Sequence, residues 1–117
     1  MEQVVLYHNP RWGKSRGVVA LLKEKKISYC VIEYLKEGIS KEAVLILAKK
    51  LNKNPIDFIR KSDMDFKKRV LAKDTLDNIK MAEFVEKYPK VLERPIVVKG
   101  QKAIIGRPPE NILKLFN

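Results

Sequence analysis

Residues 8–16, HNPRWGKSR, lie between a short apolar run and a helical pattern, a place where small α/β proteins often carry chemistry. A loop that joins a strand to a helix N-terminus offers unpaired backbone N–H groups and the positive end of the helix dipole, which favour an anion or a thiolate. Trp12, at the centre of the loop, has one N–H donor and no ionisable nucleophile. By composition alone, a plain connector with Asn9-Pro and Gly13 as turn formers explains the loop equally well.

Three arginines stand where a fork-like oxyanion contact is feasible. Arg60 follows an apolar helical segment, Arg94 precedes Pro95 and a predicted strand, and Arg107 follows AIIG at a strand end. Each alone is more often a surface charge, and spacing alone does not show that the three converge. Pro95 is by default an ordinary strand-start proline, and the alternative is a cis proline beside a site.

The charge balance points to anionic partners. The formal charge of +11 and the isoelectric point near 9.8 favour a small oxyanion, nucleic acid or an acidic protein surface. Most of the basic residues are lysines interleaved with acids, a pattern typical of solvated helix faces. No basic stripe interleaved with aromatics supports nucleic-acid binding.

The location and the redox state are also constrained. No apolar run is long enough for a membrane span, and the N-terminus lacks the pattern of a signal peptide. Cys30 is the only cysteine, so no internal disulfide is possible, and its place in a predicted strand favours a small buried apolar role. We therefore predict a cytoplasmic protein.

The surrounding elements predict one α/β domain over residues 1–117. A buried strand over 3–7, a helix over 14–26 and a strand over 27–35 make a parallel βαβ unit. A helical block follows, with Ser40 as an N-cap. A hairpin with KGQK between its two β-branched runs and a closing helix from Pro108 complete the order β-α-β, helices, β-β-α.

Four strings taken together resemble the ArsC family of small arsenate reductases, in order and over essentially the whole chain. They are YHNPRWGKSR, FIRKSD, LERPIVVKG and AIIGRPPENIL. The resemblance implies a thioredoxin-like fold with a helical insertion between its two halves. It also implies reduction of arsenate to arsenite coupled to glutathione and glutaredoxin, with neither a bound cofactor nor a metal.

The resemblance also assigns roles to individual positions. Arg60, Arg94 and Arg107 match the arginines that bind the oxyanion. The positions that support the loop and the nucleophile are His8, Asn9, Ser15 and the cis proline Pro95. Trp12 stands where the family has its nucleophilic cysteine.

Because an indole cannot form the thiol–arsenate adduct, we expect the family reaction to fail in this sequence. Ser15 does not replace a thiol, since a neutral hydroxyl needs a base and forms no reducible bond. Two interpretations of Trp12 remain: a scaffold that binds arsenate, phosphate, sulfate or a partner, or a changed residue in an otherwise working reductase. In the first, the indole ring either leaves the anion site open or fills it beside an arginine.

The alternative function is a non-enzymatic interaction module. The ArsC family is similar in fold to the Spx transcription regulators, which bind RNA polymerase. Those regulators usually show Cys-x-x-Cys in the loop, whereas positions 12 and 15 here are Trp and Ser. HNP and GRPPE resemble the reductase branch more closely, so this alternative depends on fold and charge.

Overall fold

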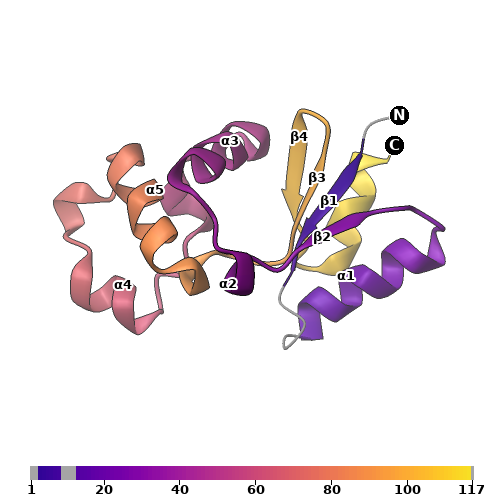
Figure 1. Cartoon of the computed structure of the whole chain (residues 1–117), viewed down its shortest axis with the longest axis horizontal. Helices are drawn as coiled ribbons and strands as arrows, with labels where there is room; N and C mark the ends of the chain where they lie inside the picture. The colour runs from indigo at the N-terminus through magenta and orange to yellow at the C-terminus, as the bar shows by residue number, and fades with distance from the viewer. Residues whose placement is uncertain (1–2, 9–12, 117) are drawn as a thin grey trace. The chain divides into compact units, whose positions relative to one another are not determined.

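The computed structural model describes residues 3–8 and 13–116, which form two compact units (Figure 1). The first unit runs to Glu37 and resumes at Arg94, and the second spans Gly38–Glu93. The elements of the first unit are β1 (Val4–Tyr7), α1 (Gly13–Glu24), β2 (Cys30–Ile32), α2 (Tyr34–Glu37), β3 (Ile96–Lys99), β4 (Lys102–Ile105) and the 3₁₀ helix η4 (Pro109–Leu115). Those of the second are α3 (Lys41–Leu51), η1 (Pro55–Phe58), α4 (Met64–Arg69), η2 (Ala72–Asp74), α5 (Asn78–Lys87) and η3 (Pro89–Val91). The single domain stays a prediction.

The first unit is built on one four-stranded sheet with the order β2-β1-β3-β4. β1 and β2 are parallel and joined through α1, whereas β3 pairs antiparallel with both β1 and β4. The predicted βαβ unit and the predicted hairpin are therefore both confirmed. The hairpin turns at Gly100, whose φ of 60° lies in the left-handed region that glycine adopts without strain.

The core of the first unit lies between the sheet and two helical segments. Val4 and Leu6 alternate onto one face of β1, where they meet Val18 and Leu22 of α1. Ile112 of η4 joins the same cluster, and η4 packs against both α1 and β4 (Figure 1). These contacts fix where α1 begins relative to the strand ends.

Three details of the first unit differ from the expectation. The strand predicted over 27–35 is shorter, because the carbonyl of Glu33 accepts from the N–H groups of Lys36 and Glu37 and starts α2. β2 is also an edge strand, so Cys30 is exposed rather than buried. The closing helix exists, but in 3₁₀ rather than α geometry.

The second unit is the predicted helical block. α3 packs against α5, and Val44 and Leu47 of α3 are buried there. Ser40 is the N-cap of α3 as predicted, since its side chain accepts from the N–H of Ala43 at 3.1 Å. Asn52 ends the helix in the left-handed conformation.

None of the helices in the described part of the chain is long and apolar enough to cross a membrane. The longest, α1, has 12 residues.

Candidate functional site

The strand register brings several predicted site residues to one end of the sheet, the edge at which β1 and β4 end and β3 begins. Tyr7 pairs with Ile96, and Ile96 pairs with Ile105. One residue beyond this row stand His8 after β1, Pro95 before β3 and Gly106 after β4. The N–H of His8 donates to Ile32 at 3.0 Å, and that of Gly106 donates to Pro95 at 2.8 Å. The ladder therefore continues past the strand ends.

Arg94 directly precedes Pro95, and Arg107 directly follows Gly106, so the two arginines flank this edge. The Arg94 side chain is buried and only 7% exposed, whereas Arg107 is exposed. The Arg94–Pro95 peptide bond is cis, which confirms the predicted geometry of Pro95, and the Arg107–Pro108 bond is cis as well. The edge thus carries one buried and one solvent-facing guanidinium.

Gly106 allows the strand ends to approach each other closely. A Cβ atom at this position would lie 2.6 Å from Cγ2 of Val18 and 3.2 Å from Cγ of Pro95. The contact with Val18 is too short for a Cβ atom and that with Pro95 is tight, so only glycine fits without movement. Gly106 therefore lets α1, the Pro95 ring and the end of β4 pack closely together.

His8 places a buried imidazole at this edge. It is 9% exposed, and its Nδ1 has no hydrogen-bond partner among the described residues. Burial lowers the pKa of His8, and the negative charge of Glu33 opposes that shift. Burial therefore favours the uncharged form of the ring, which offers hydrogen bonds rather than a fixed positive charge.

Ser15 lies in the first turn of α1 and is fully buried. Since α1 begins only a few residues after His8, the positive end of its dipole belongs to the same edge of the sheet. A buried imidazole, two guanidinium groups and a helix N-terminus together favour a small anion and disfavour a cation.

The remaining predicted residues stand apart from this cluster. Arg60 belongs to the second unit, where its N–H donates to Val91 at 2.6 Å, so its convergence with Arg94 and Arg107 stays a prediction. Asn9 and Trp12 lie outside the described residues. The roles assigned to all of these positions likewise stay predictions.

The sequence reasoning missed two residues of this edge. Glu33 follows β2, and its negative charge raises the pKa of His8. The predicted parallel pairing of β1 and β2 was the signal that could have found it, because it places the ends of these two strands side by side. Gly106 was visible as the glycine that ends AIIG, but its packing partners come from distant segments.

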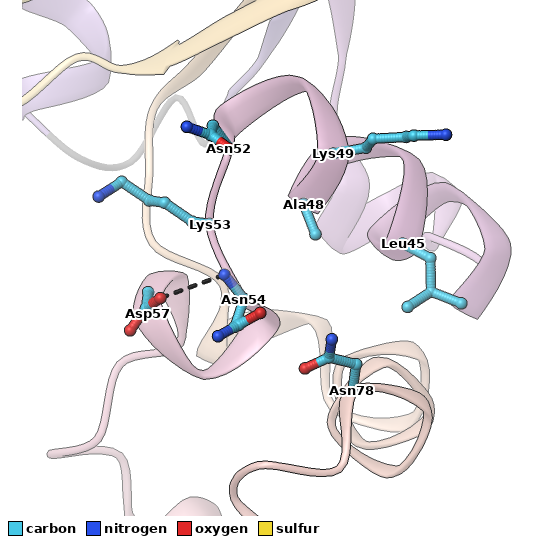
Figure 2. A pocket seen from close by; sticks show the side chains of 8 residues that line it. All are labelled: Leu45, Ala48, Lys49, Asn52, Lys53, Asn54, Asp57 and Asn78. Carbon is cyan, nitrogen blue, oxygen red and sulfur yellow. Dashed lines mark hydrogen bonds between the residues drawn. The ribbon is translucent and has the colours of Figure 1, made fainter.

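The second unit has a polar pocket of its own, and none of the predicted site residues lines it (Figure 2). The N–H of Asn54 donates to Asp57 across its wall at 3.1 Å, and Leu45 and Ala48 also line it. No group of three or more His, Cys, Asp or Glu side chains able to hold a metal ion occurs within residues 3–8 and 13–116.

The mixed four-stranded sheet, with α1 after the first strand, defines a thioredoxin-like α/β protein. The ArsC family matches residues 7–115, and the chain belongs to that family. An arsenate reductase of Haemophilus influenzae is 35% identical over 114 residues, 97% of this chain and 98% of the relative. The Escherichia coli protein YfgD is 37% identical over 115 residues, 97% of each chain. The structure of an arsenate reductase from Vibrio cholerae has a TM-score of 0.85 at 34% identity, covering 97% of both chains.

Proposed function

We propose that this ArsC-family protein binds a small tetrahedral oxyanion at the edge formed by His8, Arg94 and Arg107. The observation that carries the proposal is the strand register, which places all three at one end of the sheet beside the start of α1. Arsenate is the first candidate, because relatives that match nearly the whole chain are named arsenate reductases. Phosphate and sulfate share its shape and charge.

We further propose that the chain does not reduce arsenate. In the reaction that the family implies, a thiolate displaces an oxygen ligand on arsenic, and a second thiol later releases the reduced product. Trp12 occupies the position of that thiol. Cys30 does not replace it, because it lies at the start of β2, at the opposite end of the strand pair from His8. We therefore expect the protein to bind the oxyanion without reducing it.

The test of this proposal restores the thiol. Reduction of arsenate is followed as NADPH oxidation in the presence of glutathione, glutathione reductase and glutaredoxin. We expect the unaltered protein to show no turnover above a control without it, and Trp12→Cys to show arsenate-dependent turnover. Trp12→Ser is the matched control, because it removes the ring without adding a thiol, and we expect it to stay inactive.

Two outcomes of this assay contradict the proposal. Turnover by the unaltered protein shows that Trp12 does not abolish the reaction. A folded Trp12→Cys protein that stays inactive shows that the arginines are not arranged as the resemblance implies.

The anion site is tested separately by calorimetric titration with arsenate, phosphate and sulfate. Arg107→Met removes the exposed guanidinium, and we expect at least about tenfold weaker binding, the usual effect of losing a charged hydrogen bond. Arg69→Met is the matched control, because Arg69 is an exposed arginine of the second unit that pairs with Asp65. Equal losses in both variants mean that net charge alone drives binding.

The second candidate is the non-enzymatic module similar to the Spx regulators, and the formal charge of +11, which suits an acidic partner surface, is the observation that favours it. It predicts that the chain binds purified RNA polymerase and that Trp12→Cys leaves this affinity unchanged. Arginine-dependent binding of arsenate without any binding to polymerase favours the oxyanion proposal instead.

A further inference from the structure

A cavity of about 640 Å³ opens in the first unit at the end of the sheet opposite His8. Its lining comes from the start of β1, the turn between α1 and β2, the end of β3 and the C-terminal segment. The described lining residues are Gln3, Val4, Lys26, Ile27, Ser28, Tyr29, Cys30, Lys99 and Phe116. β1 has four residues, so the cavity lies about 13 Å along the strand from the oxyanion edge.

The size and the walls of this cavity suit a small organic molecule. Pockets that bury such ligands commonly measure about 300–1,000 Å³ and have apolar walls with a few polar groups. Val4 is almost fully buried here, and Ile27, Tyr29 and Phe116 pack against the same apolar cluster. The apolar wall of the cavity is therefore formed by side chains that belong to the core of the unit or pack against it.

The turn that forms one wall is held by backbone hydrogen bonds. The N–H of Lys26 donates to Lys23 and that of Ile27 donates to Leu22, each at 3.0 Å. Lys26 has a φ of 58°, so this pattern is the left-handed cap that ends α1. The cap fixes the point at which the Lys26 side chain leaves the backbone.

Among the described lining residues, both charged side chains are cations. Lys99 Nζ donates to the carbonyl of Leu115 at 3.2 Å and lies 5.1 Å from the ring centroid of Phe116. This ammonium is thus held at the cavity wall and keeps further N–H donors for a ligand. Lys26 supplies the second positive charge, and no carboxylate occurs among the described lining residues.

We propose that this cavity binds an amphipathic organic anion, with an aromatic or aliphatic body on the apolar wall and one carboxylate or sulfonate toward Lys26 and Lys99. Apolar burial supplies affinity for the body, and the two ammonium groups select the charged end. The site is separate from the oxyanion edge, and it does not depend on Arg94, Arg107 or Trp12.

Cys30 provides a built-in reporter of occupancy. It is exposed, lines the cavity and accepts a hydrogen bond from Gln3 Nε2 at 2.7 Å. Because it is the only thiol in the chain, the rate of its alkylation by iodoacetamide reports on this one position. A bound ligand is expected to slow that rate.

The test compares two fluorescent probes with similar aromatic bodies. The first is 8-anilinonaphthalene-1-sulfonate, which carries an anionic group, and the second is the uncharged N-phenyl-1-naphthylamine. We expect the sulfonate to bind the full chain more tightly and to protect Cys30 from alkylation. Equal affinity for the two probes, or binding of the sulfonate without protection of Cys30, overturns the proposal.

Charge-removal variants then locate the anionic group. We expect Lys26→Met and Lys99→Met each to weaken binding of the sulfonate about fivefold, the effect of losing one partly exposed ion pair, with little change for the neutral probe. Lys25→Met is the matched control, since Lys25 is an exposed neighbour outside the lining. A loss in Lys25→Met equal to that in Lys26→Met overturns the proposal, because general surface charge then explains binding.

A filling variant tests the cavity itself. Ser28→Phe places a ring at an exposed lining position, and we expect it to weaken binding of both probes while the circular dichroism spectrum stays unchanged. Unchanged binding of both probes in this variant shows that they bind elsewhere and contradicts the proposal.

Discussion

The substitution Gly106→Ala probes the packing that holds the two arginines at one edge. The added Cβ would stand 2.6 Å from Cγ2 of Val18, which is fully buried, and 3.2 Å from the Pro95 ring. Real Cβ contacts are longer, so α1 or the strand end must shift. Because Gly106 lies between the Pro95 end of β3 and Arg107, we expect the shift to lower stability and to disturb the proposed anion site.

The expected destabilisation follows from two opposing effects. Overpacking a close-packed core costs about 1–3 kcal/mol, whereas replacing glycine restricts the unfolded chain and returns about 0.4–1 kcal/mol. The net loss in the free energy of unfolding is about 1–2 kcal/mol. For a chain of 117 residues this corresponds to a fall in Tm of about 4–8 °C.

Urea unfolding followed by circular dichroism measures this loss. Gly17→Ala is the matched control: its Cβ would meet only Pro109, with the nearest atom at 3.0 Å, and alanine is favoured in a helix by about 1 kcal/mol. We expect that control to change stability little. A Gly106→Ala protein as stable as the unaltered one refutes the packing argument.

A double-mutant cycle with Val18→Ala isolates the contact. Val18→Ala removes the Cγ2 atom that a Cβ at Gly106 would strike, so Gly106→Ala should cost at least about 1 kcal/mol less in that background. Additivity within about 0.5 kcal/mol means that the loss comes from elsewhere in the structure.

Two further predictions concern pH and helix capping. His8 is the only histidine, and burial lowers its pKa in the folded protein. As the pH falls below about 6.5, the unfolded chain therefore takes up the proton before the folded one does, and the free energy of unfolding should fall. His8→Gln should remove this part of the pH dependence in urea unfolding. An NMR titration of the single imidazole that gives a pKa above 6.5 contradicts this sign. Ser40→Ala should cost about 1 kcal/mol because it removes the N-cap of α3, whereas Ser62→Ala, at an exposed serine outside any helix, should be neutral; equal effects in the two variants argue against the cap.

The parts of the fold that were predicted correctly have local or pairwise signals. The β-branched run over 3–7 and the helical stripe of Val18 and Leu22 suffice for a parallel βαβ unit, because its handedness and connection follow general rules. The hairpin follows from two β-branched runs with a glycine between them. Ser40 precedes an apolar helical repeat, which is the usual sign of an N-cap.

The errors arise where the outcome depends on sheet order. The sequence around Cys30 reads as a buried strand, but β3 pairs with the other side of β1 and leaves β2 at the edge. At this edge Cys30 is exposed, and β2 ends after Ile32 because the Glu33 carbonyl accepts from Lys36 and Glu37 and starts α2. Nothing in the local pattern of residues 27–35 encodes which neighbour β1 will take on its second side.

The same dependence on sheet order underlies our proposal that anion binding and thiol chemistry are separable in this protein. His8, Arg94 and Arg107 adjoin strand ends, and their positions follow from ladder hydrogen bonds and from the close approach at Gly106. These contacts lie among β1, β3, β4 and α1, so we expect the strand pairing that brings the two arginines to this end of the sheet to persist when the residue at position 12 is changed. We therefore expect an ArsC-family chain without the thiol to keep an anion site. For this reason the single substitution Trp12→Cys is a sufficient test of the reductase interpretation.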